Sequence, residues 1–349
     1  MATIKDVAKL AGVGVGTASR VISGRGAVSA DAQARVQQAV ASLEFRPSSI
    51  ARALSLRTLG MIGVYVPHFG STFYGPVLQA VDEELRRVDK HMVAANGCGR
   101  GDIRQQALDG VNFLIQKECD GILVLSNDLL DSDLVDLQRR FPRMVVVNRC
   151  VPGLAGRSFS TDHELGGRLV ARALLARGHR EIAVISGPHQ APDNEARMHG
   201  FFDELAQHQV RVPVERIADG NFNFASGHAA TESLLAAGRP AFTALFAAND
   251  VMAMAAINRL QAQGLQVPRE VSLIGFDDAD LASYTTPRLT TVRIPIEATA
   301  VHAAGYLINE CYGGEFAVQR NFPPELVWRE SVGLGPHPPL ALDLLAPVS

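Results

Sequence analysis

Long apolar runs are absent from this sequence, although 47% of its 349 residues are hydrophobic. No stretch of about eighteen or more apolar residues occurs, and a helix that spans a membrane needs a stretch of that length. The first residues, MATIKD, contain no apolar core of a signal peptide. These absences predict a cytoplasmic protein with no membrane partner.

Cysteine is scarce, and its spacing is unlike that of a metal site. The four cysteines, Cys98, Cys119, Cys150 and Cys311, form no CxxC pair, so neither a zinc site nor a disulfide framework is predicted. The ten histidines form no pair at helical spacing. Strings typical of serine hydrolases, zinc proteases, P-loop proteins and EF-hands are also missing. We therefore predict no catalytic residue, no metal and no cofactor, and a protein that is not an enzyme.

A glycine-rich segment at residues 12–16, GVGVG, invites a dinucleotide-binding interpretation. The dinucleotide motif follows a strand and needs a third glycine for close helix–strand packing. No strand-like run precedes this segment, and Thr17 stands where the third glycine would be. The sequence therefore excludes the dinucleotide-binding interpretation.

The net charge of −3 hides an asymmetry between the two parts of the chain. Residues 1–58 carry eight Lys and Arg against three Asp and Glu, a net charge of +5, and the remainder carries −8. A basic segment attached to an acidic body indicates a module that binds a polyanion. A solvated basic face is the alternative interpretation.

The first 45 residues predict three short helices. Thr3 and Asp6 have the spacing of a capping box, and Gly12 is placed to end the first helix. Ser29 is a typical N-cap for the third helix. The second helix is expected over about 15–23, with inward-facing candidates Val15, Ala18, Val21 and Ile22. Two short helices joined by a glycine-containing turn and completed by a third predict a small all-α helix-turn-helix domain.

From residue 61 onward the pattern changes to alternating strands and helices. Apolar strand-like runs lie at 61–67, 91–96, 121–126, 144–149, 181–187, 243–250, 271–278 and 289–295. Near-continuous apolar strands that alternate with helices indicate parallel sheets covered on both faces. These strands are too many for one such sheet of ordinary size, so the pattern predicts a two-lobed α/β domain.

The expected domain boundaries follow from these patterns. A helix-turn-helix domain covers 1–45, a connector covers 46–58, the two-lobed domain covers 59–335, and a flexible proline-rich tail covers 336–349. The first lobe is expected at about 59–160 and 290–320, and the second at about 161–289 and 321–335. The strand at 289–295 and the helix at 296–312 are both expected to return to the first lobe.

The string TIKDVAKLAGVGVGTASRVISGRGAVS resembles the helix-turn-helix of the LacI/GalR family of bacterial repressors almost residue for residue. The resemblance implies that Val15, Gly16 and Arg20 face the major groove. It implies that Thr17 and Ser19 contact phosphates or support the recognition helix. Arg20 can donate paired hydrogen bonds to guanine O6 and N7, with a phosphate contact as the alternative. The other implied DNA-binding residues of this domain are Thr3, Lys5 and Ser29.

One position departs from the family pattern. The family usually has a serine at position 14 that caps the recognition helix, and this sequence has Gly14. Gly16 within the helix costs about 1 kcal/mol relative to alanine. We therefore expect a weaker recognition helix, or one that DNA orders, and the base preference at residue 16 is open.

The connector RPSSIARALS resembles the hinge helix of the same family. Leu54 matches the leucine that the family inserts into the minor groove, and an apolar wedge is a known device for kinking DNA. Ser49 and Arg52 belong to the same implied set of DNA contacts. Packing of Leu54 on the two-lobed domain is the alternative.

The resemblance continues to about residue 335 and is closest to the galactose-repressor branch. It is carried by STFYGPVLQAV, VVNRCVPGLAGR, FTALFAANDVMA, VSLIGFDD and PRLTTVRIPI. The fold that it implies is that of periplasmic sugar-binding proteins, with the effector in the cleft between the lobes. The implied effector-binding residues are Phe73, Asp162, Arg197, Phe222, Asn249 and Asp277. A core position for Phe222 and a helix-capping role for Asp277 are the alternatives.

The chemistry of this set fits a small neutral sugar. Aromatic faces stack on a pyranose, and Asp, Asn and Arg side chains pair with vicinal hydroxyls. Two carboxylates, Asp162 and Asp277, against the single cation Arg197 would repel an anionic ligand. We therefore expect a galactose-like or glucose-like effector.

Together these features predict a sequence-specific transcriptional regulator, a repressor of a sugar-utilisation operon, which binds a pseudo-palindromic operator as a homodimer. A solute-binding protein of a transport system would share the two lobes, but it needs export, and the basic N-terminal domain argues against it. A sugar-processing enzyme would need a catalytic group that the sequence lacks. Whether the sugar induces or co-represses stays open.

Overall fold

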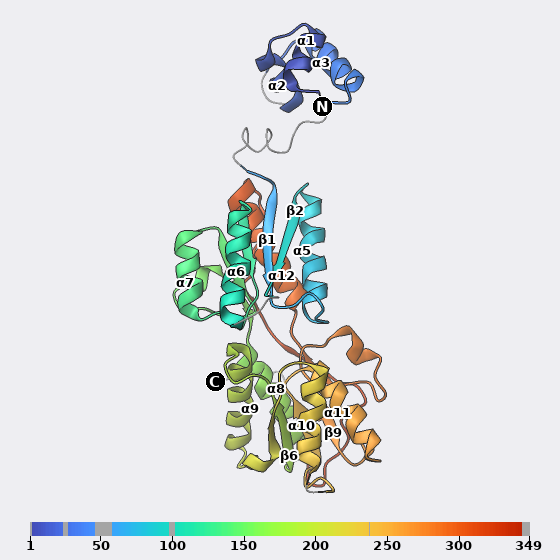
Figure 1. The fold of residues 1–349 in the computed structure, drawn as a ribbon. Helices are drawn as coiled ribbons and strands as arrows, with labels where there is room; N and C mark the ends of the chain where they lie inside the picture. Colours follow the sequence, from blue (N-terminus) through green and yellow to red (C-terminus); the bar gives the residue numbers. More distant parts are fainter. Residues whose placement is uncertain (1, 24–26, 46–57, 98–101, 237, 344–349) are drawn as a thin grey trace. The chain divides into compact units, whose positions relative to one another are not determined.

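The computed structural model describes residues 2–23, 27–45, 58–97, 102–236 and 238–343. The chain divides into two compact units, and each is described here by itself. We call the N-terminal helical unit the head and the large unit from residue 62 onward the body (Figure 1). Within the described residues, no helix is both long and apolar enough to cross a membrane.

The head contains the three predicted helices: α1 (Ile4–Ala11), α2 (Val15–Ser23) and α3 (Ala30–Ser42). The predicted capping box is confirmed, because Thr3 Oγ1 accepts from the Asp6 amide and Asp6 Oδ2 accepts from the Thr3 amide at 2.8 Å. Gly12 ends α1 in the left-handed conformation, at φ 62°. The Ser29 side chain caps α3, as predicted.

The head has its own small apolar core, built from one face of each helix. Its buried members are Val7, Ala8, Ala11, Ala18, Val36 and Ala39. Val21 and Ile22 pack against this core as expected, whereas Val15 is 44% exposed. Val15 is therefore not a core residue, because the start of α2 turns this position outward.

The first lobe of the body is a six-stranded sheet in the order β11-β5-β4-β3-β1-β2. Its strands are β1 (Met61–Val66), β2 (His91–Asn96), β3 (Gly121–Val124), β4 (Met144–Val147), β5 (Ser158–Thr161) and β11 (Asn321–Phe322). The helices of this lobe are α5 (Tyr74–Arg87), α6 (Ile103–Gln116), α7 (Asp131–Arg140) and α12 (Ile296–Tyr312). Strands β3 and β4 are buried along their whole length, as the apolar runs predict for a parallel sheet covered on both faces.

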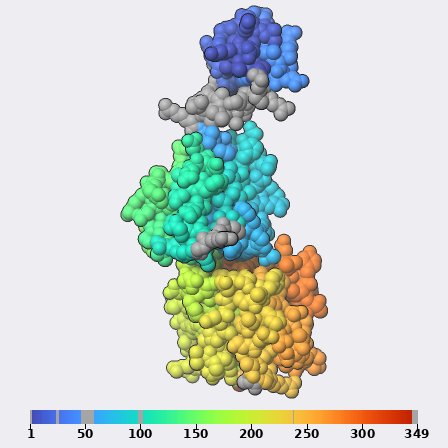
Figure 2. All heavy atoms as spheres, in the orientation of Figure 1, coloured from blue at the N-terminus to red at the C-terminus, as the bar shows by residue number. Residues whose placement is uncertain are grey.

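The second lobe is a four-stranded parallel sheet in the order β7-β6-β8-β9. Its strands are β6 (Ile182–Ser186), β7 (Ile217–Asp219), β8 (Ala244–Ala247) and β9 (Ser272–Ile274). Its helices are α8 (His163–Ala176), α9 (Pro192–Gln207), α10 (Phe224–Leu235) and α11 (Asp250–Ala262). Helices α8 and α9 pack together, as do α10 and α11. Figure 2 shows the two lobes as adjoining masses, the first cyan to green and the second yellow to orange.

The boundary between the lobes differs from the expected division at two places. Strand β10 (Thr291–Arg293) was expected in the first lobe, but it pairs with β12 (Glu325–Val327) and continues the second-lobe sheet through bridges Ile274–Thr290 and Asp277–Arg293. Strand β11 was assigned to the second lobe, but it pairs with β5 of the first. Helix α12 lies in the first lobe, as expected, where it packs on α5. Long-range strand pairing decides these positions, and local sequence patterns carry no information about it.

The described part of the C-terminal tail also differs from the expectation of a flexible segment. Three backbone amides at this end of the chain donate to carbonyls at the end of α8 and just beyond it, at 2.7–3.2 Å. The donors are Gly335, His337 and Leu340. The His337 imidazole lies 3.0 Å from the Glu181 carboxylate. Residues 336–343 are therefore attached to the second lobe.

Candidate functional site

Helix α2, which the family resemblance implies to be the recognition helix, presents a polar, open surface. Its Ser19 and Arg20 are exposed and its Thr17 is half-buried, and Lys5 on α1 is also exposed. Arg20 Nε donates to the Gly16 carbonyl at 3.3 Å, so the guanidinium folds back along its own helix. Its outer nitrogens have no hydrogen-bond partner among the residues of the head that the structure describes. A side chain held this loosely can extend to a base edge or a phosphate.

Two of the predicted DNA-binding side chains also have a structural function. The hydroxyls of Thr3 and Ser29 cap α1 and α3, respectively. N-cap hydroxyls and the exposed amides around them are also common phosphate contacts, so both functions are compatible. Ser49, Arg52 and Leu54 lie outside the described residues.

The start of α2 carries no side-chain cap. The Gly14 carbonyl accepts the first helical hydrogen bond, from the Ala18 amide at 3.0 Å, which places Gly14 at the N-cap position. Apart from the adjoining backbone of the same segment, no heavy atom of the described residues lies within 4 Å of a Cβ built on Gly14 or on Gly16. Neither glycine is therefore required by packing within the head.

The body encloses a cavity of about 640 Å³ between its two lobes. Five of the six predicted effector-binding residues line it, namely Phe73, Arg197, Phe222, Asn249 and Asp277. Asp162 does not line it: this side chain is exposed and caps α8 by accepting from the Leu165 amide at 2.8 Å. The prediction that Asp162 binds the effector is therefore wrong for this cavity. A match of sequence positions cannot tell whether an aspartate before a helix caps that helix or points into the cleft.

The parallel strands explain why these residues converge. Asn249 follows β8 and Asp277 follows β9, and the carboxyl ends of parallel strands meet at one edge of a sheet, where ligands of α/β proteins bind. Gly187 follows β6, and a Cβ there would lie 2.4 Å from Cζ of Phe222. A glycine is therefore needed at this position for the Phe222 ring to reach the cavity.

Arg197 lies at the inner end of the cavity and is only 2% exposed. Its guanidinium lies 3.7 Å from the centroid of the Phe276 ring and donates to the Ala248 carbonyl. The Asp277 carboxylate is 4.0 Å away, at the limit of an ion pair. Burial lowers the pKa of Arg197, although the nearby carboxylates oppose that shift.

Asp277 is a cavity carboxylate whose ion-pair partner, Arg197, is 4.0 Å away. Burial raises its pKa well above the usual range; Arg197 opposes this shift, and Asp250 and Asp193 add to it. Its backbone is held at φ 109°, an unfavourable region for a residue with a side chain. The structure gives this side chain no capping role, because η3 (Asp280–Ser283) begins after Ala279. Asp277 is therefore a strained, buried group with hydrogen-bonding capacity to spare.

Asn249 and Phe222 are partly engaged already. Asn249 Oδ1 caps α11 by accepting from the Met252 amide at 3.0 Å, and Nδ2 donates to the Phe222 carbonyl at 3.3 Å. The Phe222 ring lies 5.8 Å from the Arg197 guanidinium and packs against the main apolar core while lining the cavity. Both residues are held rigidly, which favours a preformed site.

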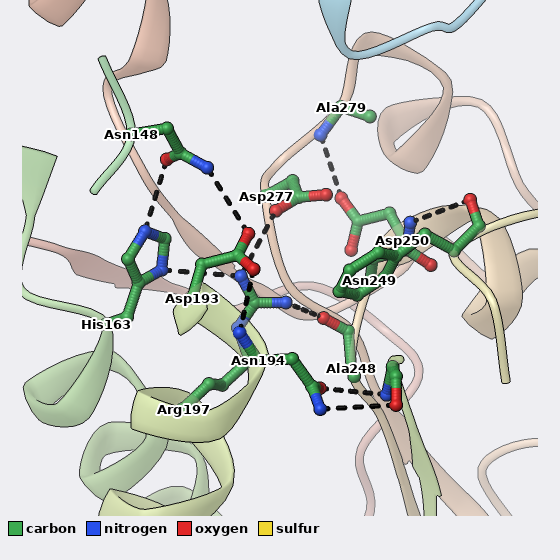
Figure 3. A network of polar contacts seen from close by, with 12 residues as sticks. Asn148, His163, Asp193, Asn194, Arg197, Ala248, Asn249, Asp250, Asp277 and Ala279 are labelled. Atoms are coloured by element: carbon green, nitrogen blue, oxygen red, sulfur yellow. Dashed lines mark hydrogen bonds and ion pairs between the residues drawn. The ribbon is translucent and has the colours of Figure 1, made fainter. Parts of the chain in front are cut away.

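A polar network links the two lobes beside the cavity (Figure 3). Asp193, in the first turn of α9, accepts from Asn127 at 2.8 Å and from Asn148 at 3.3 Å. Both asparagines belong to the first lobe, and both lie beyond the carboxyl end of a strand. The carboxylate of a second-lobe helix is thus bound by two amides from the first lobe.

His163 extends this network to Arg197. Its Nδ1 lies 3.3 Å from Arg197 Nη2 and its Nε2 lies 3.1 Å from Asn148 Oδ1. A guanidinium can only donate, so Nδ1 must accept and the proton must be on Nε2. Burial lowers the pKa of His163 to about 4, and the charge of Arg197 contributes to the shift. The imidazole is therefore neutral at physiological pH.

The sequence analysis missed three cavity residues that carry this network: Asn127, Asn148 and Asp193. Asn127 directly follows the apolar run at 121–126, and Asn148 lies near the carboxyl end of the run at 144–149, so the rule of strand carboxyl ends would have selected both. Asp193 lies in a helix, where no comparable signal marks it. Among the described residues, no three His, Cys, Asp or Glu side chains are grouped to hold a metal ion.

Two sequence-family profiles match separate parts of the chain. The profile for bacterial regulatory proteins of the lacI family matches residues 3–48. The profile for a periplasmic binding protein-like domain matches residues 171–332.

Individual proteins match over most of the chain. The regulator GalR of Escherichia coli K12 is 36% identical over 333 residues, which cover 95% of this chain and 96% of GalR. A crystal structure of a LacI-family regulator from Burkholderia phymatum is 46% identical, with a TM-score of 0.76 over 78% of this chain and 99% of that one. A complex of the regulator CelR with cellobiose is 29% identical, with a TM-score of 0.67 over 95% of this chain and all of that one.

Proposed function

The chain belongs to the lacI family of bacterial regulatory proteins and is a DNA-binding transcriptional regulator, and from this premise we propose that the cavity of its body binds the effector. Members of this family bind operator DNA as dimers and respond to sugar effectors, and they are not enzymes. The observation that carries the proposal is that five residues implied by the family resemblance line one cavity.

The charges around the cavity favour a neutral sugar. The carboxylates of Asp128, Asp193 and Asp277 line it against the buried cation Arg197. An anionic ligand would add a negative charge to a site that already holds three carboxyl groups against one cation, whereas hydroxyls can donate to carboxylates and accept from the guanidinium. The ring of Phe222 supplies an apolar face for the sugar. A relative solved with cellobiose supports the same ligand class.

Effector control is proposed to act through the orientation of the lobes. The cavity is lined by both lobes, so the affinity of a ligand depends on how they are placed relative to one another. If operator binding and sugar binding favour different orientations, each weakens the other by the same factor. We propose that the sugar releases the operator and that the protein is a repressor of a sugar-utilisation operon.

The head is proposed to read a pseudo-palindromic operator, one half-site for each protomer of a dimer. Arg20, Gly16 and Val15 face the base edges, and Lys5, Thr17 and Ser19 hold the backbone. Ser49, Arg52 and Leu54 are proposed to continue the interface in the connector. A regulator of operator DNA works in the cytoplasm, which we propose as its location.

Calorimetry on the full chain tests the proposed ligand class. Titration of D-galactose and D-glucose into wild-type protein should give saturable binding, and Asp277→Ala should abolish it. Gluconate and a hexose phosphate serve as anionic controls and should not bind. Tight binding of the anions with no binding of neutral sugars would overturn the assignment of the ligand class.

A further inference from the structure

The loop that carries Asp277 holds two consecutive residues in a conformation that side chains rarely adopt. Asp277 has a φ of 109° and Asp278 a φ of 58°. Neither residue is a glycine, so this backbone conformation is unfavourable and persists only where the surrounding contacts hold it. The contacts of this loop therefore decide where the Asp277 carboxylate lies in the cavity.

The side chain of Asp277 contributes little to holding the loop. Among the residues that the structure describes, its carboxylate has one ion-pair partner, Arg197, at 4.0 Å, and no hydrogen bond. Its backbone amide donates to the Val292 carbonyl at 2.8 Å, on β10. The carboxylate thus has capacity for a ligand, and the neighbours of Asp277 must fix the loop.

Asp278, the next residue, is bound firmly by two arginines. Arg329 Nη2 donates to Oδ1 at 2.5 Å, and Arg293 Nε donates to Oδ2 at 2.7 Å. Arg329 Nη1 also donates to the Leu289 carbonyl at 2.8 Å, which orients the guanidinium. The side chains of Asp278 and Arg329 are only 7% and 13% exposed, so water and salt screen this ion pair weakly.

The two arginines lie on paired segments of the second lobe. Arg293 is the last residue of β10, and Arg329 lies two residues beyond the end of β12. Strands β10 and β12 pair in antiparallel register, so Asp278 attaches the loop to a two-stranded base. We call Asp278, Arg293 and Arg329 the clamp. None of the three lines the cavity, so they can affect a ligand only through other residues.

The residue after Asp278 is held by a further buried carboxylate. The Ala279 amide donates to Asp250 Oδ2 at 2.8 Å (Figure 3). The Thr291 hydroxyl, also on β10, donates to Asp250 Oδ1 at 2.6 Å. The loop is therefore fixed at Asp278 and at Ala279, immediately beyond the residue that faces the cavity.

We propose that Asp278, held by Arg293 and Arg329, is a positioning residue of the effector site, which fixes the strained loop so that the Asp277 carboxylate faces the ligand before the ligand binds. The proposal rests on the proposed function of the cavity and adds to it residues that do not touch the ligand. A carboxylate that is already in place saves the ordering of the loop on binding. Loosening the clamp should therefore weaken sugar binding although no group is removed from the cavity.

Two conservative variants loosen the clamp from opposite sides. In Asp278→Asn one carboxylate oxygen becomes an amide nitrogen, so one of the two arginines loses its acceptor in either orientation of the amide. Asparagine tolerates the left-handed region, so this variant adds no backbone strain at φ 58°. Arg329→Lys keeps the charge but offers one nitrogen in place of the two that bind Asp278 and the Leu289 carbonyl.

Glu204→Gln is the matched control for a buried ion pair of the same lobe. The Glu204 side chain is 3% exposed and pairs with Arg168 and Arg172, and it does not line the cavity. A structural role alone would make all three variants less stable to heat and would leave sugar affinity unchanged. Sugar affinity is therefore the readout that separates positioning from structure.

The experiment measures sugar affinity and loop protection in the full-length protein. Calorimetry with D-galactose and D-glucose should show that Asp278→Asn and Arg329→Lys each bind the sugar at least about tenfold more weakly than wild type. Hydrogen exchange without ligand, followed by mass spectrometry of a peptide covering 275–281, should be at least about tenfold faster in both variants. Glu204→Gln should change each quantity by less than about twofold.

Each outcome has a distinct meaning. Faster exchange of the loop together with weaker sugar binding in both clamp variants supports the proposal. If the loop exchanges as in wild type, the clamp does not hold it and the proposal is wrong. The proposal is also wrong if the sugar binds as tightly as to wild type, or if Glu204→Gln weakens binding equally. If wild-type protein binds no sugar, the proposed function fails and the positioning role fails with it, whereas a failure of the positioning role alone leaves wild-type binding intact.

Discussion

Asn127 Nδ2 donates a hydrogen bond of 2.8 Å to Asp193 Oδ1 and so links a first-lobe loop to the first turn of a second-lobe helix. The backbone amide of Asn194 donates to the same oxygen at 2.8 Å. The side-chain Nδ2 of Asn148 donates to the other carboxylate oxygen, Asp193 Oδ2. The carboxylate is buried, so its removal cannot be compensated fully by water.

Asp193→Ala should lower the free energy of unfolding of the body by about 1–3 kcal/mol, because it leaves the buried amide of Asn148 and the half-buried amide of Asn127 without their acceptor. Urea unfolding followed by circular dichroism measures the change. Asp136→Ala is the control, since Asp136 is exposed and, among the residues that the structure describes, pairs only with Arg139 along its own helix. Its effect should stay below about 0.5 kcal/mol. Equal unfolding curves for both variants would show that the link between the lobes contributes no stability.

His163 should make the body less stable as the pH falls. Its folded-state pKa of about 4 lies below the usual value of 6.5 for an exposed histidine, so the unfolded chain binds a proton first as the pH falls. The contribution of neutral His163 is complete above about pH 6.5 and is lost as the pH falls towards 4. Between pH 7.5 and 5 the loss from this residue is about 2 kcal/mol.

The measurement compares the unfolding free energies of wild type and His163→Asn at pH 7.5 and pH 5. The variant has no titrating group at this position, so its stability relative to wild type should rise by about 2 kcal/mol at the lower pH. A constant difference between wild type and His163→Asn at both pH values would contradict the assigned neutral tautomer.

The two glycines at the start of α2 should respond oppositely to the same substitution. Gly16→Ala should stabilise the helix by about 0.5–1 kcal/mol, because alanine loses less backbone entropy there. Gly14→Ala should weaken it, because alanine is a poor N-cap. Hydrogen exchange of α2 amides in the full chain measures both effects, and Gly14→Ser should slow exchange relative to Gly14→Ala. Two alanine variants with the same sign would contradict the N-cap assignment of Gly14.

Arg20→Ala should weaken binding to the operator by about 1–3 kcal/mol and relax the preference for one base in each half-site. Lys5→Ala is the comparison, since a phosphate contact lowers affinity for all sequences alike. Binding to a panel of single-base operator variants, measured by fluorescence anisotropy at fixed salt, separates the two effects. An unchanged base preference in Arg20→Ala would make Arg20 a phosphate contact.

The elements that the sequence predicted well are those specified by local chemistry. The caps at Thr3 and Ser29 and all eight apolar strand runs were found, because capping and continuous burial leave local patterns. Strands β5, β7, β11 and β12 were missed, since runs of two to four residues carry little periodic signal. The lobe assignment of β10 and β11 depended on pairing with distant strands, which no local pattern encodes.

The residues of the cavity were predicted only in part, because the sequence does not show which side chains meet in space. Positions carried over from the family resemblance gave five cavity residues, but they also included Asp162, whose side chain caps a helix. The link between the lobes was missed because Asp193 and its partners lie far apart in sequence, and single residues of these types are common. The tautomer of His163 follows only from the three-dimensional placement of Arg197.

The most direct test of the account measures operator affinity with and without sugar in wild type and in Asp277→Ala. The operator duplex is first selected from a randomised pool by the wild-type protein, and the sugar is the one that binds in calorimetry. Both proteins should bind the duplex with the same affinity when sugar is absent, which also shows that the variant is folded. Saturating sugar should weaken wild-type binding at least about tenfold, or about 1.4 kcal/mol, and leave Asp277→Ala unchanged. If Asp277→Ala responds to the sugar as wild type does, the cavity is not the control site and the central claim is wrong.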